Sequence, residues 1–220
     1  LLEVKSGTAD AVVLDYTLAS AMVGEGTDYA DLMIIDGLDL ELSLDDEFET
    51  IREEFLAKAG SDYAASRGEY LNGIILAKYI GFDFIDAENV IYFKENGSFD
   101  EEKTNKILAE ELMQYEKAVI PGFYGVMPNG TIKTFSRGGS DITGSIVARA
   151  AAADLYENWT DVSGFLMADP RIIDNPETIP EVTYDKLREL SYSGAQVLNE
   201  GTIFPVREKS IPLNIRNTND

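Results

Sequence analysis

Short apolar runs alternate with amphipathic helical patterns along most of the chain, and this alternation limits the folds that are open to it. The predicted strands lie at 11–14, on both sides of a polar turn within 82–93, and at 118–126, 132–136, 153–164 and 211–220. The predicted helices begin at about 17 and 141, or lie at 42–60, 67–81, 99–117 and 183–198. Because parallel strands need crossover connections, the pattern predicts an α/β layered fold with a mainly parallel sheet.

Capping signals mark the ends of two predicted helices. Ser43 is the expected N-cap of the helix at 42–60, acidic residues fill its first turn, and Gly60 follows its end. Gly81 is the expected stop of the helix at 67–81.

The composition excludes several classes of chemistry. With 40 acidic and 18 basic residues, the net charge of −22 argues against nucleic acid and anionic membrane as partners. The sequence has no Cys and no His, which removes disulfides, thiol catalysis, most zinc sites and every Ser-His-Asp mechanism. No apolar run reaches the ~18–20 residues of a membrane helix, and no signal-peptide pattern opens the chain. We therefore expect a cytoplasmic protein whose acid–base or charge-stabilising chemistry comes from Asp, Glu, Lys, Arg, Tyr or backbone groups.

The stretch "FSRGGSDITGS" places glycines, a cation and a carboxylate immediately before an apolar helix. Gly138 and Gly139 allow close approach to the backbone, and Ser140 or Asp141 can cap the helix. A helix N-terminus favours an anion, and Arg137 adds a planar cation suited to carboxylate or phosphate. From the pattern alone, a tight strand-to-helix turn with a solvated arginine fits equally well.

A second charged stretch, "SRGEYLNG" at 66–73, opens another apolar helix. Glu69 is expected in the first turn, where the helix dipole favours an acid. A purely structural role accounts for this residue as well as a binding role does.

The third stretch is "ENWTDVSGFLMADPRI". Trp159, Thr160 and Asp161 come where a strand should end, which is where open α/β sheets bind ligands. The following loop carries Asp169 and Arg171, and an arginine held after a proline can stabilise phosphate charge. The alternative is a surface loop with Trp159 filling the core.

Together these motifs resemble the catalytic domain of the aspartate kinases. S-R-G-E, G-F, G-G-S-D, W-T-D-V and D-P-R occur in the family's order between about Asp36 and Asp220. The resemblance implies a three-layer α/β/α sandwich of the amino-acid-kinase type. It also implies ATP-dependent phosphorylation of the side-chain carboxylate of aspartate, with ATP and Mg²⁺ as cofactors and aspartate as the substrate. A homodimer is one option for its assembly.

The resemblance assigns roles to particular residues. Around the aspartate substrate it places Glu69, Phe123, Arg137, Gly138, Gly139 and Ser140. Arg137 would pair with a substrate carboxylate, Glu69 would face the ammonium, and Asp141 would organise the catalytic centre. At the nucleotide it places Thr160, Asp161, Asp169 and Arg171.

The sequence departs from the family at three places. It has no K-F-G-G-T-S loop, whose lysine contacts the transferring phosphate in the family. Gln196 stands where some members carry a lysine, and Asn199 replaces the usual histidine. The chain also stops after "IRNTND", before the family's regulatory domains. Catalysis impaired by the missing lysine loop, non-catalytic binding of an amino acid or nucleotide, and a folded mosaic without ligand function are the alternatives.

The N-terminal segment resembles a different family. "LLEVKSGTADAVVLDYTLASAMVGEGTDYADLMII" is similar to the second lobe of periplasmic amino-acid-binding proteins, in which the position of Asp15 faces a ligand ammonium. We therefore predict two parts: a βα segment at 1–35 packed on the kinase sheet, and a kinase-like domain at 36–220.

Overall fold

The computed structural model of the chain describes residues 23–24, 26–27, 29–32, 42–136, 138–160, 164, 166–167, 173–174, 176–192 and 200–219. The chain divides into two compact units, Leu1–Leu42 and Ser43–Asp220. The first unit contains a parallel bridge between Val23 and Tyr29. The strand predicted at 11–14 and the helix predicted from 17 lie outside the described residues.

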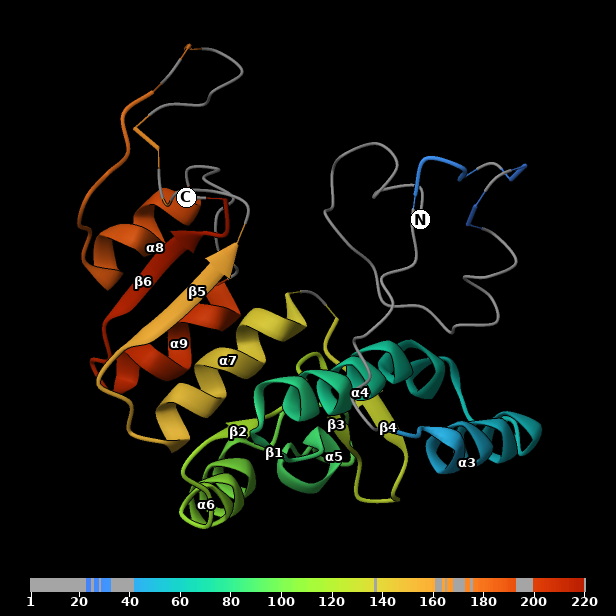
Figure 1. Cartoon of the computed structure of the whole chain (residues 1–220). Coiled ribbons are helices and arrows are strands. Elements are labelled where there is room, and N and C mark those ends of the chain that lie inside the picture. Colours follow the sequence, from blue (N-terminus) through green and yellow to red (C-terminus); the bar gives the residue numbers. More distant parts are fainter. Residues whose placement is uncertain are drawn as a thin grey trace. The chain divides into compact units, whose positions relative to one another are not determined.

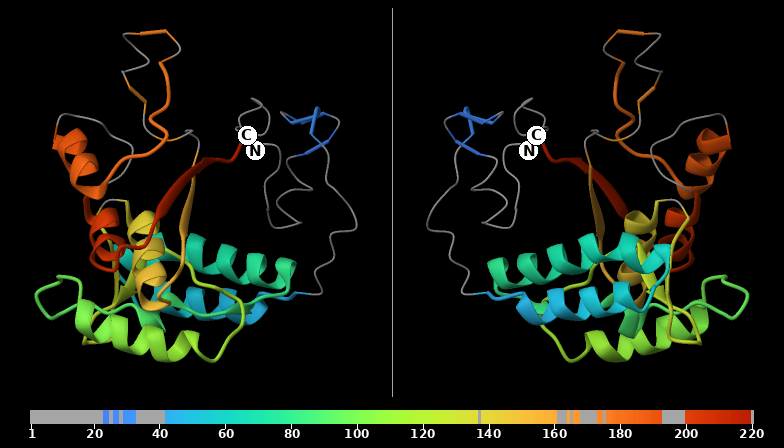
Figure 2. Two further views of the ribbon diagram at one scale, coloured as in Figure 1. Left: turned by 90° about the vertical axis from the view of Figure 1, so that its left-hand side faces the viewer. Right: turned by 90° about the vertical axis from the view of Figure 1, so that its right-hand side faces the viewer.

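Two helices open the second unit, and they lie against each other in Figures 1 and 2. Helix α3 spans Asp45–Leu56 and helix α4 spans Ser61–Ile80. The predicted N-cap of α3 is wrong by one residue, because the cap position is Leu44 and the Ser43 hydroxyl instead accepts from the Asp45 N–H. Gly60 lies past α3 as predicted and is itself the N-cap position of α4. Gly81 ends α4 in the left-handed conformation, as predicted.

The middle of the chain alternates short strands and helices. Its elements are β1 Asp83–Phe84, α5 Ala87–Val90, α6 Glu101–Leu112, β2 Ala118–Val119, β3 Tyr124–Val126 and β4 Ile132–Thr134. The one-turn helix α5 takes the place of the polar turn predicted within 82–93, and the segments on both sides of it pair as strands do, Asp83–Phe84 with β2 and Tyr92 with Val126. The side-chain cap of α5 explains the change, since the Asp86 carboxylate accepts from the Glu88 N–H. Helix α6 is capped in the same way by Asp100.

The last part of the chain contains helix α7, Gly139–Ala150, and the strands β5, Tyr156–Thr160, and β6, Leu213–Asn217. Helices α8, Tyr184–Tyr192, and α9, Glu200–Glu208, lie between these strands in the sequence. Helix α7 packs on both α9 and β5. The sequence analysis did not predict α9, which contains a proline.

The described strands form three pairs. β1 pairs with β2 in parallel, β3 pairs with β4 as an antiparallel hairpin, and β5 pairs with β6 in parallel, as Figure 1 shows. A further parallel bridge joins Tyr92 to Val126. Parallel pairing with helices on the flanks confirms the predicted α/β class. The described residues place these strands in separate pairs rather than in one continuous sheet.

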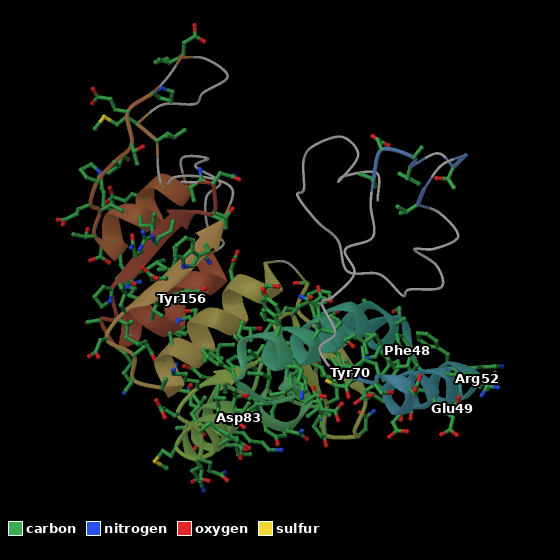
Figure 3. All side chains as sticks on the ribbon, in the orientation of Figure 1. Phe48, Glu49, Arg52, Tyr70, Asp83 and Tyr156 are labelled. Atoms are coloured by element: carbon green, nitrogen blue, oxygen red, sulfur yellow. The ribbon has the colours of Figure 1, made fainter. Side chains whose placement is uncertain are left out.

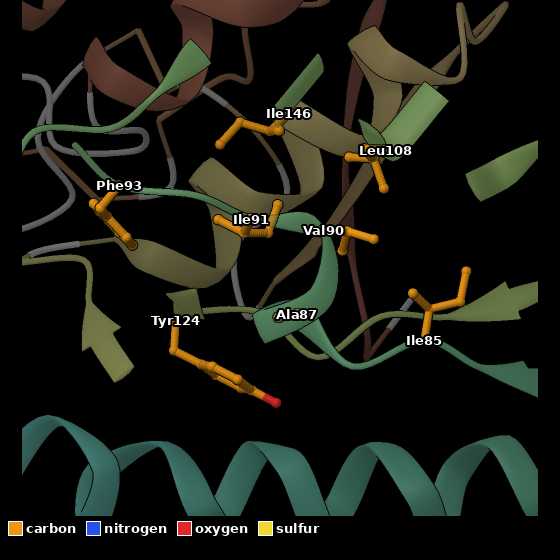
Figure 4. Packing of buried hydrophobic residues seen from close by; sticks show 8 residues of the cluster. All are labelled: Ile85, Ala87, Val90, Ile91, Phe93, Leu108, Tyr124 and Ile146. Carbon is orange, nitrogen blue, oxygen red and sulfur yellow. The ribbon is translucent and has the colours of Figure 1, made fainter. Parts of the chain in front are cut away.

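The main apolar core lies where α5, α6, β3 and α7 meet. Its largest buried members include Ile91, Leu108, Tyr124 and Ile146. Figure 4 shows most of these side chains clustered around α5 and the segment that follows it, with the Tyr124 ring reaching toward the ribbon of α4. The core thus fixes the start of β3, and through it the loop before β3, which carries one of the predicted motifs.

Candidate active site

The loop at 121–123 and the first turn of α7 are in direct backbone contact. A Cβ added to Gly122 would lie 2.9 Å from the Ser140 Cα atom, and one added to Gly139 would lie 2.9 Å from the Phe123 Cα atom. Real Cβ atoms do not approach that closely, so both positions require glycine. The fold therefore brings together the G-F and G-G-S-D motifs, which are more than a dozen residues apart in the sequence.

Phe123 has an unusual backbone conformation at this contact. Its φ of 82° lies in the left-handed region, which is an outlier for a bulky aromatic residue. The Thr143 hydroxyl holds the backbone there, since it accepts from the Phe123 N–H at 3.1 Å and donates to the Gly139 carbonyl at 2.8 Å. Thr143 is buried and was not among the predicted site residues. Its position in the interior of an apolar helix gave no sequence signal.

The N-terminus of α7 has no side-chain cap. The N-cap position is Gly138, in the left-handed conformation with φ 59° and ψ 31°. The expected cap by Ser140 or Asp141 is therefore wrong, because both residues lie inside the first turn. Among the described residues, no side chain caps these first N–H groups, and a helix N-terminus of this kind, next to the Phe123 loop, favours an anion.

Asp141 is joined to β5 by a partly buried polar network. Its Oδ1 atom accepts from the amide of Asn158 at 3.0 Å, and its carbonyl oxygen accepts from the Tyr156 hydroxyl at 3.2 Å. The Asn158 amide also donates to the Tyr156 hydroxyl at 3.1 Å. Burial raises the pKa of Tyr156, the Asn158 amide lowers it and the Asp141 charge raises it further, so the hydroxyl stays neutral. Figure 3 labels Tyr156 on β5.

Glu69 lies on α4, but not where the sequence analysis expected it. The helix begins at Ser61, so Glu69 lies more than two turns inside it and gains nothing from the helix dipole. Gly73, one turn later on the same face, packs against Pro121: a Cβ there would lie 3.4 Å from the Pro121 Cβ. Glu69 therefore shares the face of α4 that meets the 121–123 loop.

Arg67, in the same S-R-G-E motif, is buried with 8% of its surface exposed. Its guanidinium carbon lies 4.4, 4.6 and 5.4 Å from the ring centres of Tyr63, Tyr70 and Tyr124. Its Nε and Nη2 atoms both donate to the Ser66 hydroxyl. Of the two charged residues in this motif, Arg67 thus belongs to the packing beneath α4. Figure 3 labels its neighbour Tyr70.

The predicted nucleotide residues lie mostly outside the described residues. Thr160 is the last residue of β5, where a strand was expected to end. Trp159 is 53% exposed, with the Arg216 guanidinium 4.7 Å from its ring centre, so its expected alternative role as core filler is wrong. The predicted site residues that lie outside the described residues are Arg137, Asp161, Asp169 and Arg171.

Within the described parts of the chain, no group of three or more Asp or Glu residues is arranged to hold a metal ion. A cavity of about 430 Å³ lies near the far end of α7, lined in part by Asn105, Arg149 and Lys209. None of the predicted site residues that the structure describes lines it.

Comparison with known proteins identifies the family. The sequence model of the amino acid kinase family matches residues 17–217. The chain belongs to the amino acid kinase family. This member is 38% identical over 168 residues to aspartokinase 3 of Bacillus subtilis, an alignment that covers 72% of the chain and 37% of the relative. The predicted resemblance to aspartate kinases is therefore confirmed.

Solved structures agree with the sequence comparison. The aspartate kinase of Clostridium acetobutylicum matches with a TM-score of 0.75 and 56% identity, covering 83% of this chain and 41% of that one. Aspartokinase III of Escherichia coli, solved in complex with aspartate and ADP, matches with a TM-score of 0.68 and 25% identity, covering 80% and 44%. The kinase-like fold is thus confirmed, and the chain spans about two fifths of the length of these relatives. No helix among the described residues has the length and apolar character needed to cross a membrane.

Proposed function

We propose that this chain carries the aspartate-binding and phosphoryl-acceptor part of an ATP-dependent aspartate kinase. In the reaction, a side-chain carboxylate oxygen of aspartate bonds to the γ-phosphorus of ATP, the bond from that phosphorus to the β–γ bridging oxygen breaks, and ADP leaves. The observation that supports this most is the direct contact between the Phe123 loop and the uncapped start of α7, with Asp141 in the first turn. A Clostridium aspartate kinase 56% identical to the chain supports the choice of substrate.

The acceptor side of the site follows from charge and backbone. Free N–H groups at the start of α7 suit a substrate carboxylate, and Arg137 would supply a second, cationic contact. Glu69, on the face of α4 that meets the same loop, would accept from the substrate ammonium. The close approach at Gly122 and Gly139 brings the 121–123 loop directly against the start of α7. A small amino acid held at both of its charged ends would need its contacts close together in this way.

The nucleotide side would be formed by the end of β5 and the loop that follows it. Thr160 stands at that end, and we propose Asp161, Asp169 and Arg171 as further nucleotide residues, with Arg171 near the phosphates. Mg²⁺ would neutralise phosphate charge during the transfer. Because the described residues offer no three-carboxylate cage, the ion would be held mainly by the phosphates.

Three further predictions remain proposals. We infer that the kinase-like part begins at about residue 36 and that 1–35 is a separate βα segment, although the family match begins at residue 17. The cytoplasmic location and the homodimer also stay predictions.

The first experiment is a thermal melt with L-aspartate and Mg-ATP, each present at about 100 times its dissociation constant. A ligand at that excess stabilises by about 2.7 kcal/mol, which shifts the melting temperature of a protein of this size by roughly 5–10 °C. A matched melt with D-aspartate tests whether the pocket recognises the arrangement of the charged groups. Glu69→Gln should abolish the shift with aspartate, and Glu49→Gln, an exposed position on α3, should leave it unchanged.

Turnover is measured separately, by trapping the acyl phosphate with hydroxylamine. Hydroxamate that forms only when both aspartate and ATP are present supports kinase activity. A second candidate, a binder without turnover, is favoured by one sequence observation: no K-F-G-G-T-S stretch occurs in the 220 residues. A stable protein whose melting temperature moves with aspartate but which forms no hydroxamate would support that candidate. A melt insensitive to both ligands would rule out both functions.

A further inference from the structure

Asn158 is a buried polar side chain that none of the motifs includes. It lies in β5 with 6% of its surface exposed, and on the same face of the strand as Thr160, two residues later. A buried amide is unfavourable unless its hydrogen bonds are made. Its two amide hydrogens are used by Asp141 and Tyr156, at 3.0 and 3.1 Å.

The geometry points to Asn158 as the positioning residue for Asp141. An ionised carboxylate can only accept hydrogen bonds, so an amide N–H group is a partner that fixes it without competing for its charge. Tyr156 completes the arrangement, since its hydroxyl accepts from Asn158 and donates to the Asp141 carbonyl. Asp141 is therefore held at two atoms, one in the side chain and one in the backbone, by neighbouring residues of a single strand.

The network is closely packed around α7. A Cβ added to Gly144 would lie 2.5 Å from the Tyr156 hydroxyl oxygen, so the ring reaches α7 only because that position is glycine. The contact spans 17 residues of sequence and joins the helix of the G-G-S-D motif to the strand of the W-T-D-V motif. Asn158 thus links the acceptor side of the proposed site to its nucleotide side, and its effect on phosphoryl transfer rests on the proposed function.

The contact itself is tested without activity, by following the Asn158 side-chain amide by NMR in the wild-type chain and in Asp141→Ala. Asp141 is half-buried at the start of a helix, so the alanine variant leaves the core intact. Loss of the carboxylate should move the Asn158 amide resonance and speed its hydrogen exchange. An unmoved resonance with unchanged exchange overturns the proposal.

The consequence is tested in the turnover assay with Asn158→Leu, which has nearly the same shape and no donor. We expect kcat to fall by about 10–100-fold, as for a misplaced reacting group, while the KM for aspartate stays within about twofold. Asn214→Leu is the matched control: Asn214 is an exposed asparagine of β6, the neighbouring strand, and its amide contacts Glu157 instead. Unchanged kcat in Asn158→Leu, or an equal loss in Asn214→Leu, overturns the role of Asn158.

Asn158→Asp adds a readout that a structural role would not change. Two carboxylates at this distance repel each other, which raises the pKa of the pair, so a proton bound at low pH restores a hydrogen-bond donor between them. The kcat of this variant should be low at neutral pH and recover toward the wild-type value as the pH falls. Among the described residues, Tyr156 is the other titratable group in contact with Asp141, and it stays neutral throughout. A kcat ratio to wild type that does not change with pH overturns the role.

The outcomes separate the two proposals. A wild-type chain that forms no hydroxamate and binds neither substrate contradicts the proposed function, and the NMR comparison then decides the Asn158–Asp141 contact alone. A wild-type chain that is active while Asn158→Leu is equally active upholds the function and overturns the positioning role.

Discussion

Two helix-to-strand contacts in this molecule bury polar side chains, and they do so in opposite ways. Beneath α4, the Arg67 guanidinium is enclosed by three tyrosine rings and donates hydrogen bonds to the Ser66 hydroxyl, so this contact is closed within the protein. Between α7 and β5, Asn158 is buried but its partner Asp141 is only half-buried. A closed polar contact such as that of Arg67, away from the proposed site, is expected to act on stability, whereas one that ends at a partly exposed carboxylate can also act on a ligand.

The closed contact should show the largest effect on stability. Arg67→Ala removes a buried side chain and its contacts with three rings, and should lower the free energy of unfolding by about 3 kcal/mol. Arg67→Met keeps most of the volume and loses the cation–π attraction, so about 1–2 kcal/mol is expected. Urea denaturation measures both losses.

Arg52→Ala is the control for this comparison. Arg52 lies on the exposed face of α3 and pairs with Glu49 one turn earlier, so its loss should cost less than about 0.5 kcal/mol. If Arg67→Ala costs no more than Arg52→Ala, the aromatic enclosure beneath α4 contributes nothing to the fold.

Thr143 provides the second test, at the contact between α7 and the Phe123 loop. Thr143→Val keeps the shape but removes the acceptor for the Phe123 N–H and the donor to the Gly139 carbonyl. A cost of about 1–2 kcal/mol is expected, because a backbone N–H loses its partner while Phe123 keeps its strained φ. Thr143→Ser retains the hydroxyl and should recover most of that loss.

The ligand response distinguishes Thr143 from Arg67. Thr143→Val should reduce the melting shift with aspartate beyond what its lower stability explains, since the Phe123 loop borders the proposed site. Arg67→Met should keep the full shift. Equal melting shifts in the two variants would mean that Thr143 acts on ligand binding no more than Arg67 does.

The sequence predicted elements better than it predicted contacts. Gly81 and the hairpin around 128–130 were correctly placed, because left-handed glycines and turn residues act locally. The first-turn position of Glu69 was wrong, since α4 starts at Ser61 in a stretch with few apolar residues. Helix α9 was missed because Pro205 is a strong breaker signal, which tertiary packing overrides here.

The same limit applies to the site. The G-F and G-G-S-D motifs could be identified by resemblance, and the structure shows why they need glycine at 122 and 139. Thr143 and Asn158 could not be identified, because each looks like an ordinary polar residue within a regular element. Their partners lie 20 and 17 residues away, and only the packing of α7 on the Phe123 loop and on β5 brings them together.

The stability of the closed contact around Arg67 should depend on pH, because Glu88 lies near it. Partial burial raises the pKa of Glu88 above its usual 4.5, the nearby Asp86 charge raises it further, and Arg67 opposes the shift. The folded state therefore binds this proton more tightly than the unfolded state, so the Glu88 contribution favours folding at low pH and is lost as the pH rises through the raised pKa. Glu88→Gln should stabilise the protein modestly at neutral pH and flatten this part of the pH profile of its unfolding free energy. A steeper fall with rising pH in the variant would contradict the assignment.

The smallest effect is expected on the outer face of the β5–β6 pair. Arg216 pairs with Glu157 at 3.1 Å and lies over the ring of Trp159, and its hydrogen bond is the main cause of the lowered pKa of Glu157. All three side chains are solvent-exposed, so water and salt weaken the attraction. Arg216→Met should cost less than about 1 kcal/mol, and the difference from wild type should shrink in 1 M salt. Because this face lies across β5 from the side chain of Asn158, the variant should leave the Asn158 amide resonance unchanged. A shift of that resonance in Arg216→Met would mean that the side chains on the exposed face of β5 influence those on its buried face. The Asn158–Asp141 contact would then depend on the ion pair on the other side of the strand.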